Sequence, residues 1–336
     1  MYYNNRDVRL EELPKPQIGA GELLMKTMAS GICGSDVLEW YRIRHAPKVL
    51  GHEVTGTVAE VSEGVRYTVG DRILATHHVP CGGCVYCINE HQTVCDLMRR
   101  TSFDPGGFSE YIRLLRPNVE TGVLPLPSAL SFEEGTFVEP LACVLRGQRH
   151  AQIQPQQTVV VLGCGVSGLL HIRLAKARNV RRIIATDLSE FRLRAAERSG
   201  ADEVINADED LPKILRDSNQ NRLADRVLVC TGARSASKQA LHSVDKGGTI
   251  LFFSAPGPDE ELPIPITDYW LNEVALTSSY GASPSDLAQS LELLRNRKVT
   301  VKDMITHRLP LADAEKGFRL VSEADKSVKV IIEPQK

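Results

Sequence analysis

The chain has 336 residues, of which 42% are hydrophobic and 24% charged, and its formal net charge is -2 at pH 7. Such a composition is typical of a globular protein, and the length suffices for two domains with a sizeable core. A net charge this close to zero gives no positive potential that would attract nucleic acid. The longest apolar run is too short to cross a bilayer. Residues 1–5 lack the features of a signal peptide, so we expect a cytoplasmic protein with 8 reduced cysteines and no nucleic-acid or membrane partner.

The first part of the chain, up to about Leu115, contains short alternating or β-branched runs separated by turn residues. These runs predict strands over Val8–Leu13, Leu23–Met28, Val54–Val61, Arg72–Ala75 and Phe108–Leu114. We therefore expect a β-barrel-like domain.

Three segments of this part carry candidate metal ligands. Cys33 lies on a loop after an apolar strand, His52 and Glu53 begin another strand, and Glu139 stands just before a probable helix with Pro140 at its first position. Cys33, His52 and either Glu53 or Glu139 supply three zinc ligands and leave a fourth position for an alcohol or water, as Lewis-acid catalysis requires. Taken singly, each is also explained as a buried thiol, a surface histidine or a solvated acid.

Four cysteines form a second and more specific signature. Cys81, Cys84, Cys87 and Cys95 have the spacing of a tetrahedral zinc shell that leaves no vacancy for a substrate. The spacing predicts a structural zinc that holds together a lobe at about residues 77–100, which lacks a core of its own. Disulfides are the alternative. We interpret the neighbouring His77, His78 and His91 as surface residues.

The pattern of a dinucleotide-binding βαβ unit begins at residue 158. Thr158–Leu162 predicts a buried parallel strand, and Gly163, Gly165 and Gly168 follow at the start of a helix that includes Val166. A second strand, Arg182–Thr186, leads to Asp187, near the offset at which a carboxylate binds the ribose diol. Because that charge repels a 2′-phosphate, the pattern favours NAD over NADP.

The remaining elements continue this unit and then return to the first domain. A helix capped by Ser189 is expected over Glu190–Arg198, and a helix capped by Ser283 over the residues to Asn296. We expect Cys143, Cys164 and Cys230 to be buried. Further strands are expected at 201–205, Arg226–Cys230, Gly248–Ser254, Val274–Tyr280, Ile305–Pro310 and Val328–Glu333.

With these motifs in this order, the chain resembles the zinc-containing medium-chain alcohol and polyol dehydrogenases, which include sorbitol and threonine dehydrogenases. The resemblance is carried by Gly31–Asp36, Gly51–Glu53, the four-cysteine lobe, Val138–Leu141 and the segment Gly163–Gly168 with Asp187. It implies an α/β fold in which a GroES-like catalytic domain, residues 1–145 and 283–336, is split around a Rossmann domain, residues 146–282. The active site is then expected in the cleft between the two domains.

The resemblance also assigns roles to single residues. It implies that Cys33, His52 and Glu139 bind a catalytic zinc, with Glu53 as a direct or alternating ligand, and that Ser35 takes the proton of the substrate. With the structural zinc, this gives two zinc ions per chain. The family pairs the edges of its Rossmann sheets, which implies a homodimer or homotetramer. The cofactor contacts that it implies are Thr231, Ser254 and Ser279 at the nicotinamide, and Arg192 and Lys329 at the ribose and pyrophosphate.

Two positions depart from the pattern of the family. Leu38 stands where many members have the histidine that ends the proton relay, so the proton must leave by another path, through His45 or water. Ser279 and Tyr280 replace the Arg-Tyr pair of sorbitol-type members, which removes a guanidinium that binds polyols.

The sequence thus predicts an NAD-dependent zinc dehydrogenase for a secondary alcohol or polyol. One alternative is a dehydrogenase of sugar phosphates or acidic substrates, because Arg42, Arg44, His45 and Lys48 form a basic cluster between two ligand segments. That cluster is also explained as a solvated loop. A second alternative is a sensor protein that binds zinc and NAD. The substrate itself is not indicated.

Overall fold

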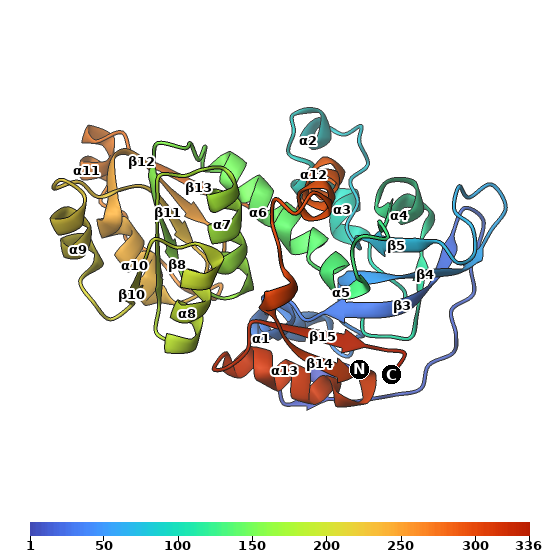
Figure 1. Cartoon of the computed structure of the whole chain (residues 1–336). Coiled ribbons are helices and arrows are strands. Elements are labelled where there is room, and N and C mark those ends of the chain that lie inside the picture. The colour runs from blue at the N-terminus through green and yellow to red at the C-terminus, as the bar shows by residue number, and fades with distance from the viewer. The chain divides into compact units, whose positions relative to one another are not determined.

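The computed structural model describes residues 1–336 and divides into two compact units (Figure 1). The first unit comprises Met1–Ala142 and Ala282–Lys336, and the second comprises Cys143–Gly281. The boundary falls inside helix α6 (Val138–His150), whereas the expected boundary was at residue 145. None of the helices is both long enough and apolar enough to span a lipid bilayer.

The first unit is built on a seven-stranded sheet with the order β14-β15-β3-β4-β5-β7, in which β6 also pairs with β3. All its pairs are antiparallel except β14 with β15. Two short strands, β1 (Tyr2–Asn4) and β2 (Asp7–Val8), pair separately. The strands of the large sheet are β3 (Leu23–Gly31), β4 (Glu53–Val61), β5 (Arg72–Ala75), β6 (Tyr111–Leu114), β7 (Val123–Pro125), β14 (Ile305–Pro310) and β15 (Lys329–Glu333).

Short helices connect these strands. The α-helices of this unit are α1 (Glu39–Arg42), α2 (Val85–Ile88), α3 (Asp96–Arg100), α4 (Arg116–Thr121), α5 (Phe132–Gly135), α12 (Pro284–Arg295) and α13 (Ala314–Glu323). The 3-10 turns are η1 (Gly34–Val37), η2 (Ile43–His45), η3 (Gln92–Val94), η4 (Lys302–Met304) and η5 (Leu311–Asp313). As expected, Ser283 caps α12, because its hydroxyl accepts a hydrogen bond from the backbone N–H of Asp286.

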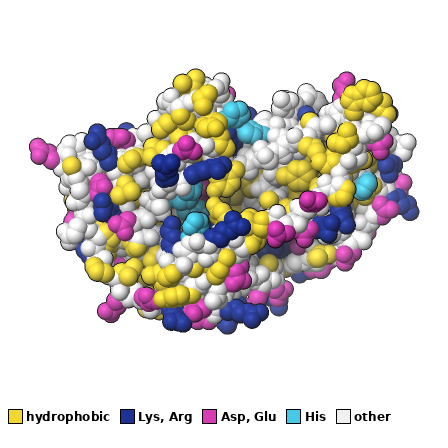
Figure 2. Space-filling model, turned by 180° about the vertical axis from the view of Figure 1, so that it is seen from behind, with side chains coloured by type: hydrophobic (Ala, Val, Ile, Leu, Met, Phe, Trp, Pro, Cys, Tyr) yellow, Lys and Arg dark blue, Asp and Glu magenta, His cyan; other side chains and the backbone are white.

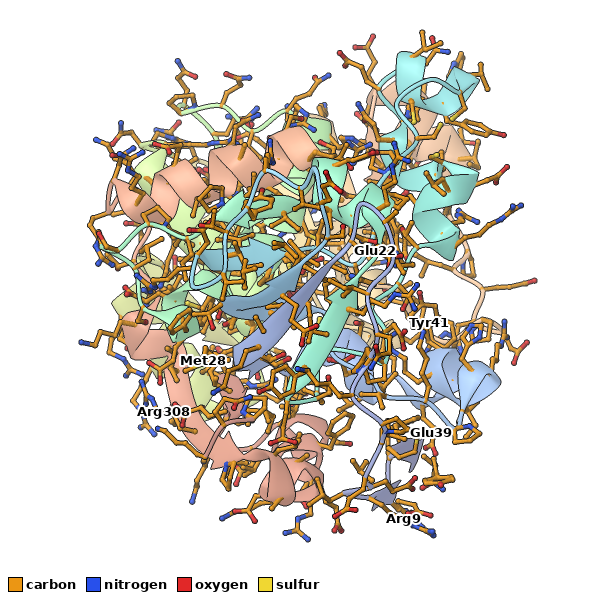
Figure 3. The ribbon with its side chains drawn as sticks, turned by 90° about the vertical axis from the view of Figure 1, so that its right-hand side faces the viewer. Arg9, Glu22, Met28, Glu39, Tyr41 and Arg308 are labelled. Carbon is orange, nitrogen blue, oxygen red and sulfur yellow. The ribbon has the colours of Figure 1, made fainter.

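The core of the first unit lies on the inward face of the sheet. Alternate residues of β3 and β4, including Leu23, Met25, Val54 and Val58, pack into one apolar cluster. Glu22 precedes β3, with Met28 toward the other end of that strand (Figure 3), and its carboxylate accepts a hydrogen bond of 2.7 Å from Arg113 Nε.

The structure corrects several of the expected elements, among them the strand expected over Phe108–Leu114, which begins at Tyr111. The strand expected over Val8–Leu13 ends at Val8, because Leu10 and Leu13 find no cross-strand partner and lie exposed before Pro14. Helix α6 begins at Val138, so Pro140 is its third residue and not its first. Ser189 precedes α8 but makes no side-chain capping bond.

The second unit is a six-stranded parallel sheet with the order β10-β9-β8-β11-β12-β13. The chain moves outward from β8 in one direction and then in the other, which is the doubly wound order expected for a Rossmann domain. Its strands are β8 (Thr158–Leu162), β9 (Arg182–Asp187), β10 (Glu203–Asn206), β11 (Ala224–Val229), β12 (Val244–Phe252) and β13 (Ala275–Ser278).

Helices cover both faces of this sheet. In Figure 1, α7 and α8 lie on one face and α9, α10 and α11 on the other. Between the helices and the sheet, the central strands bury apolar side chains such as Val160, Leu162 and Val227. The helices are α7 (Val166–Ala177), α8 (Glu190–Ser199), α9 (Leu211–Ser218), α10 (Arg234–Ser243) and α11 (Ile266–Leu271).

Candidate metal and cofactor sites

The register of β3 and β4 brings together three of the predicted zinc ligands. Gly31 pairs with Glu53, so Cys33, just beyond the end of β3, meets His52 and Glu53 at the start of β4. The ligand atoms of these three side chains all lie within 4.8 Å of one another. Glu139 is not part of this cluster; burial raises the pKa of the Glu53 carboxyl group, and the nearby charge of Glu139 adds to that effect.

The cluster has the properties of a cation site. His52 and Glu53 are 7% and 1% exposed, and Glu53 Oε1 is buried without a hydrogen-bond partner. A buried carboxylate oxygen with no partner is costly unless a ligand satisfies it. Burial opposes protonation of His52, yet Asp36 and Cys33 together raise its pKa well above the usual value. The orphaned oxygen and the donor set of sulfur, nitrogen and oxygen therefore fit a zinc ion.

Asp36 contacts two members of this cluster, Cys33 and His52. Its side chain is fully buried; Oδ2 accepts a hydrogen bond of 3.0 Å from the Cys33 backbone N–H, and Oδ1 lies 3.4 Å from His52 Nδ1. Burial works to raise the pKa of Asp36, but His52 and Arg42 hold it below its usual value. Because Nδ1 of His52 faces Asp36, Nε2 is the nitrogen available to a metal. A carboxylate at the second ring nitrogen is the usual arrangement around a metal-binding histidine.

Ser35 is hydrogen-bonded by Arg42, a residue that the sequence placed in a basic cluster for anion binding. Arg42 Nη2 donates to Ser35 Oγ at 2.9 Å, and Arg42 Nε donates to the Ser35 carbonyl oxygen at the same distance. Nη2 also lies 3.3 Å from Asp36 Oδ1. Arg42 is thus neither a solvated residue nor an open anion site. No local pattern in the sequence indicates this contact.

The resemblance implied that Lys329 holds the cofactor, but the position of its side chain does not fit this role. Its side chain is fully buried, and its ammonium group donates to Glu53 Oε2 and, at 3.3 Å, to the Ile32 carbonyl oxygen. The same group lies over the ring of Phe137. An ammonium group enclosed in this way is not accessible to a pyrophosphate. Lys329 instead supports the metal cluster through its ion pair with Glu53.

His77 and His78 are half-buried, and the expectation of surface residues was wrong for both. The His77 ring centroid lies 4.9 Å from that of His52 and 3.6 Å from that of His78. Burial lowers the pKa of His77 well below its usual value and that of His78 to about 4. The tandem histidines therefore border the metal cluster. Their position shortly after β5, at the start of the cysteine lobe, was the only signal in the sequence.

The four cysteines of the lobe come together as predicted. The sulfurs of Cys81, Cys84, Cys87 and Cys95 all lie within 4.8 Å of one another, and none forms a disulfide. Burial tends to raise the pKa of Cys95, but backbone N–H groups, that of Cys81 first, lower it to about 6. The buried apolar cluster of the lobe is small and consists of Cys87, Cys95 and Met98. The donor set and the small core fit a structural zinc.

The glycine turn of the second unit forms the predicted cradle. Gly163 has φ +96, and a Cβ at Gly168 would lie 1.9 Å from the Gly163 carbonyl oxygen. Val166 begins α7, whose N-terminal N–H groups face the turn. A Cβ at Gly165 would meet only Arg192 Nη1, at 4.0 Å, so the backbone there is open to a ligand. The Nε atom of Arg192 is buried and has no hydrogen-bond partner.

The other cofactor candidates lie at the carboxyl ends of neighbouring strands. Asp187 ends β9, and its two oxygens accept hydrogen bonds from the backbone N–H groups of Cys164 and Ser189, at 2.8 and 2.9 Å. Thr231 and Ser254 lie two residues after the ends of β11 and β12, and Ser279 directly follows β13; the ends of these parallel strands form one edge of the sheet.

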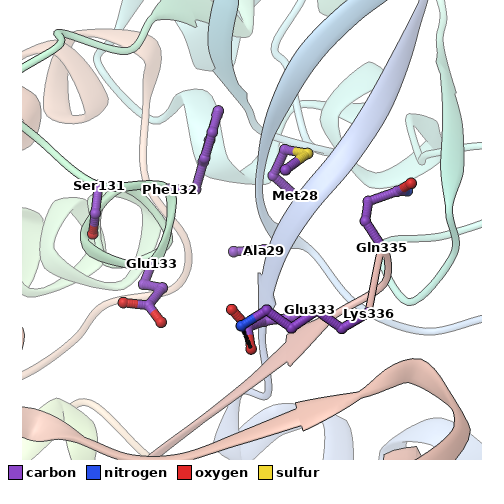
Figure 4. Close-up of a pocket in the computed structure, with 8 residues that line it drawn as sticks. All are labelled: Met28, Ala29, Ser131, Phe132, Glu133, Glu333, Gln335 and Lys336. Atoms are coloured by element: carbon purple, nitrogen blue, oxygen red, sulfur yellow. Dashed lines mark hydrogen bonds and ion pairs between the residues drawn. The ribbon is translucent and has the colours of Figure 1, made fainter.

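Two pockets on the first unit lie apart from these residues. One, of about 230 Å³, is lined by Met28, Phe132, Glu333 and their neighbours (Figure 4). The other, of about 610 Å³, lies along the N-terminal segment and reaches Phe108 and Phe318. No predicted metal or cofactor residue lines either pocket.

Comparison with known proteins covers both units. Residues 19–128 match the family described as alcohol dehydrogenase GroES-like domain, and residues 167–296 match that described as zinc-binding dehydrogenase. The sorbitol dehydrogenase of Bacillus subtilis is 29% identical, over 99% of this chain and 96% of its own. The erythritol/L-threitol dehydrogenase of Mycolicibacterium smegmatis is 31% identical, over 98% and 95%. A zinc-binding dehydrogenase of Sinorhizobium meliloti, solved with NADP, has a TM-score of 0.88 at 26% identity and covers 99% and 97%.

Proposed function

The chain belongs to the zinc-binding dehydrogenases of alcohols and polyols, and from this we propose that it transfers a hydride between a secondary alcohol and NAD. The observation that carries the proposal is the cluster of Cys33, His52 and Glu53, with one buried carboxylate oxygen left without a partner. When bound, zinc supplies the Lewis acidity that lowers the pKa of an alcohol. Glu53 is the proposed third ligand, in preference to Glu139.

The residues of the chain prepare the proton transfer. Arg42 occupies one lone pair of Ser35 Oγ and fixes its orientation. The hydroxyl group keeps a second lone pair, with which it can accept the proton of the alcohol. Leu38 offers no acceptor for the next transfer, and His45 lies exposed on η2, so we propose that water carries the proton onward.

The cofactor is proposed to be NAD. Asp187 already orders the turn by accepting from two backbone N–H groups, and its carboxylate charge disfavours a 2′-phosphate. Arg192, with its unpaired Nε, is the proposed partner of the ribose or pyrophosphate. Asp187→Ser is expected to lower the ratio of kcat/KM for NAD to that for NADP at least tenfold, and an unchanged ratio would exclude the carboxylate as the determinant.

We further propose a homo-oligomer that forms through the edge strand β13. This strand is last in the sheet and mostly exposed, and the neighbouring α11 exposes Ile266, Trp270 and Leu271 by 68%, 76% and 66%. Unpaired strand edges and apolar patches of this kind are covered in stable oligomers. Sedimentation velocity should show that Trp270→Glu forms monomers, while Ile88→Glu, on the exposed lobe, stays assembled.

The eight free thiols suit a reducing compartment, and we propose that the protein is located in the cytoplasm.

The test of the activity is NADH formation from a panel of polyols and secondary alcohols, with protein treated with a chelator as the control. We expect at least one substrate that is oxidised only by the zinc-loaded protein. Cys33→Ala should lose turnover and one zinc per chain while it keeps the circular dichroism spectrum of the parent. Turnover in a folded Cys33→Ala protein that lacks this zinc would refute the proposal.

A further inference from the structure

Lys48 carries a half-buried positive charge that no carboxylate balances. Its ammonium group makes one hydrogen bond, of 3.3 Å, to Ser102 Oγ, and it forms no ion pair. Burial and the nearby Arg42 lower the pKa of Lys48. A cation that is partly removed from water without a counter-ion is unfavourable by itself, and an incoming anion relieves that cost.

The segment 101–103 brings Lys48 to the tandem histidines. His78 Nδ1 lies 3.1 Å from the Thr101 carbonyl oxygen, Lys48 binds Ser102, and the His77 ring packs 5.9 Å from the ring of Phe103. Three consecutive residues therefore contact the three basic side chains. Figure 2 shows histidine side chains beside lysine or arginine side chains on one face of the molecule.

His77 connects this group to the metal cluster. Its ring lies 4.9 Å from that of His52, and its Nδ1 atom is buried without a hydrogen-bond partner. The backbone of His77 is fixed, because Asn118 Nδ2 donates to its carbonyl oxygen at 3.1 Å. His77 therefore has an anchored backbone and, beside the metal cluster, a ring nitrogen whose hydrogen-bonding capacity is not used.

The nearby carboxylates are already neutralised. Asp36 accepts from Arg42 and faces His52, and Glu53 is paired with Lys329. Lys48 thus remains as the unbalanced charge next to the histidines. This differs from the sequence-based alternative, in which Arg42 held the anion, since the guanidinium group of Arg42 is used by Ser35 and Asp36.

We propose that Lys48 and His77 form a subsite for an anionic group of the substrate, a carboxylate or a phosphate. The ammonium group balances the charge, and the His77 ring donates a hydrogen bond to an anionic oxygen. The inference rests on the proposed function and narrows its substrate class to hydroxy acids or phosphorylated polyols. Uncharged polyols are then the poorer substrates.

A binding measurement tests the subsite without turnover. Calorimetry on the zinc-loaded protein with saturating NAD should detect binding of inorganic phosphate or of acetate, and the stronger of the two identifies the preferred anion. Lys48→Met should weaken that binding at least tenfold, while Lys316→Met, on the exposed side of α13, should leave it unchanged. No binding by the parent protein, or equal binding by Lys48→Met, would overturn the subsite even if the protein is an active dehydrogenase.

Steady-state kinetics then show whether Lys48 and His77 recognise a charged substrate or only stabilise the fold. With sorbitol, sorbitol 6-phosphate and gluconate as substrates, kcat/KM should be at least tenfold higher for one of the charged compounds than for sorbitol. Lys48→Met and His77→Phe should each reduce this ratio at least fivefold, mainly through KM. An equal loss for charged and neutral substrates would mean that both residues are only structural. Anion binding without oxidation of any compound would instead count against the proposed function alone.

Discussion

The ammonium group of Lys329 pairs with the carboxylate of Glu53, and both side chains are almost completely buried. The register of three adjacent strands makes this contact, because Gly31 on β3 pairs with Ile331 on β15 and with Glu53 on β4. Gly31 also provides the space: a Cβ there would lie 2.3 Å from Glu53 Oε2 and 2.6 Å from Lys329 Cε. The pair leaves only Oε1 of Glu53 for a metal.

Removal of the ammonium group should therefore destabilise the protein and disturb the metal cluster. Lys329→Met leaves the carboxylate of Glu53 buried without its cation, which typically costs about 3–5 kcal/mol. We expect urea denaturation of the first unit to show a loss of this size, together with weaker zinc retention at the cluster.

The matched control is the double variant Glu53→Gln/Lys329→Met, in which neither charge is buried. It should recover most of the lost stability but not the activity, because the carboxylate ligand is absent. Equal stability of the single variant and the parent protein would show that the pair contributes nothing.

The sequence indicated the strands and the ligand sets for a physical reason. Alternating apolar residues predict strands such as β6, and metal sites use closely spaced ligands such as Cys81 and Cys84. In contrast, Lys329 and Glu53 are 276 positions apart, so neither local spacing nor periodicity reveals their contact. The resemblance assigned Lys329 to the cofactor because it supplied a position but no side-chain direction.

Ser35 should be required for turnover and not for metal binding. Its hydroxyl group is the proposed proton acceptor, and removal of a group in this role reduces rates by about 10²–10⁴-fold. Ser35→Ala is thus expected to lower kcat in this range while zinc content and NAD binding remain unchanged. Single-turnover NADH formation, measured by stopped flow, checks the effect on the chemical step.

Two further variants control for this result. Ser35→Thr keeps a hydroxyl group and should retain most of kcat. Arg42→Met removes the donor that orients Ser35 Oγ, and we expect about a tenfold loss of kcat. Full activity of Ser35→Ala would exclude the serine from the proton path.

The four-cysteine cluster should contribute to stability and not to catalysis. Cys84→Ser removes one thiolate of the proposed shell, and the lobe has little core to compensate. We expect the loss of one zinc per chain and a fall in Tm of roughly 5–10 °C, equivalent to about 2–3 kcal/mol. Tyr86→Phe, on the exposed surface of the same lobe, should leave both unchanged. Unaltered zinc content and Tm in Cys84→Ser would refute the structural role.

His171 makes the second unit sensitive to acid. Its ring is fully buried in α7, with Nδ1 3.5 Å from Gln148 Nε2 and the ring edge-on to Phe253 at 4.6 Å. Nε2 has no hydrogen-bond partner. Burial, and to a smaller extent Arg178, lowers the pKa of His171 from 6.5 to about 3. The folded state therefore excludes a proton that the unfolded chain binds below pH 6.5.

The sign of the effect follows from this difference. The stability associated with neutral His171 is fully present above pH 6.5, and it is lost as the pH falls toward the folded-state value of about 3. Between pH 7 and pH 5 this group should lower the free energy of unfolding by about 2 kcal/mol. His171→Gln should flatten the dependence of the urea midpoint on pH over this interval, whatever its stability at pH 7. His242→Gln, which changes an exposed histidine of the same unit, should keep the parent slope, and an unchanged slope in His171→Gln would assign the acid sensitivity to other groups.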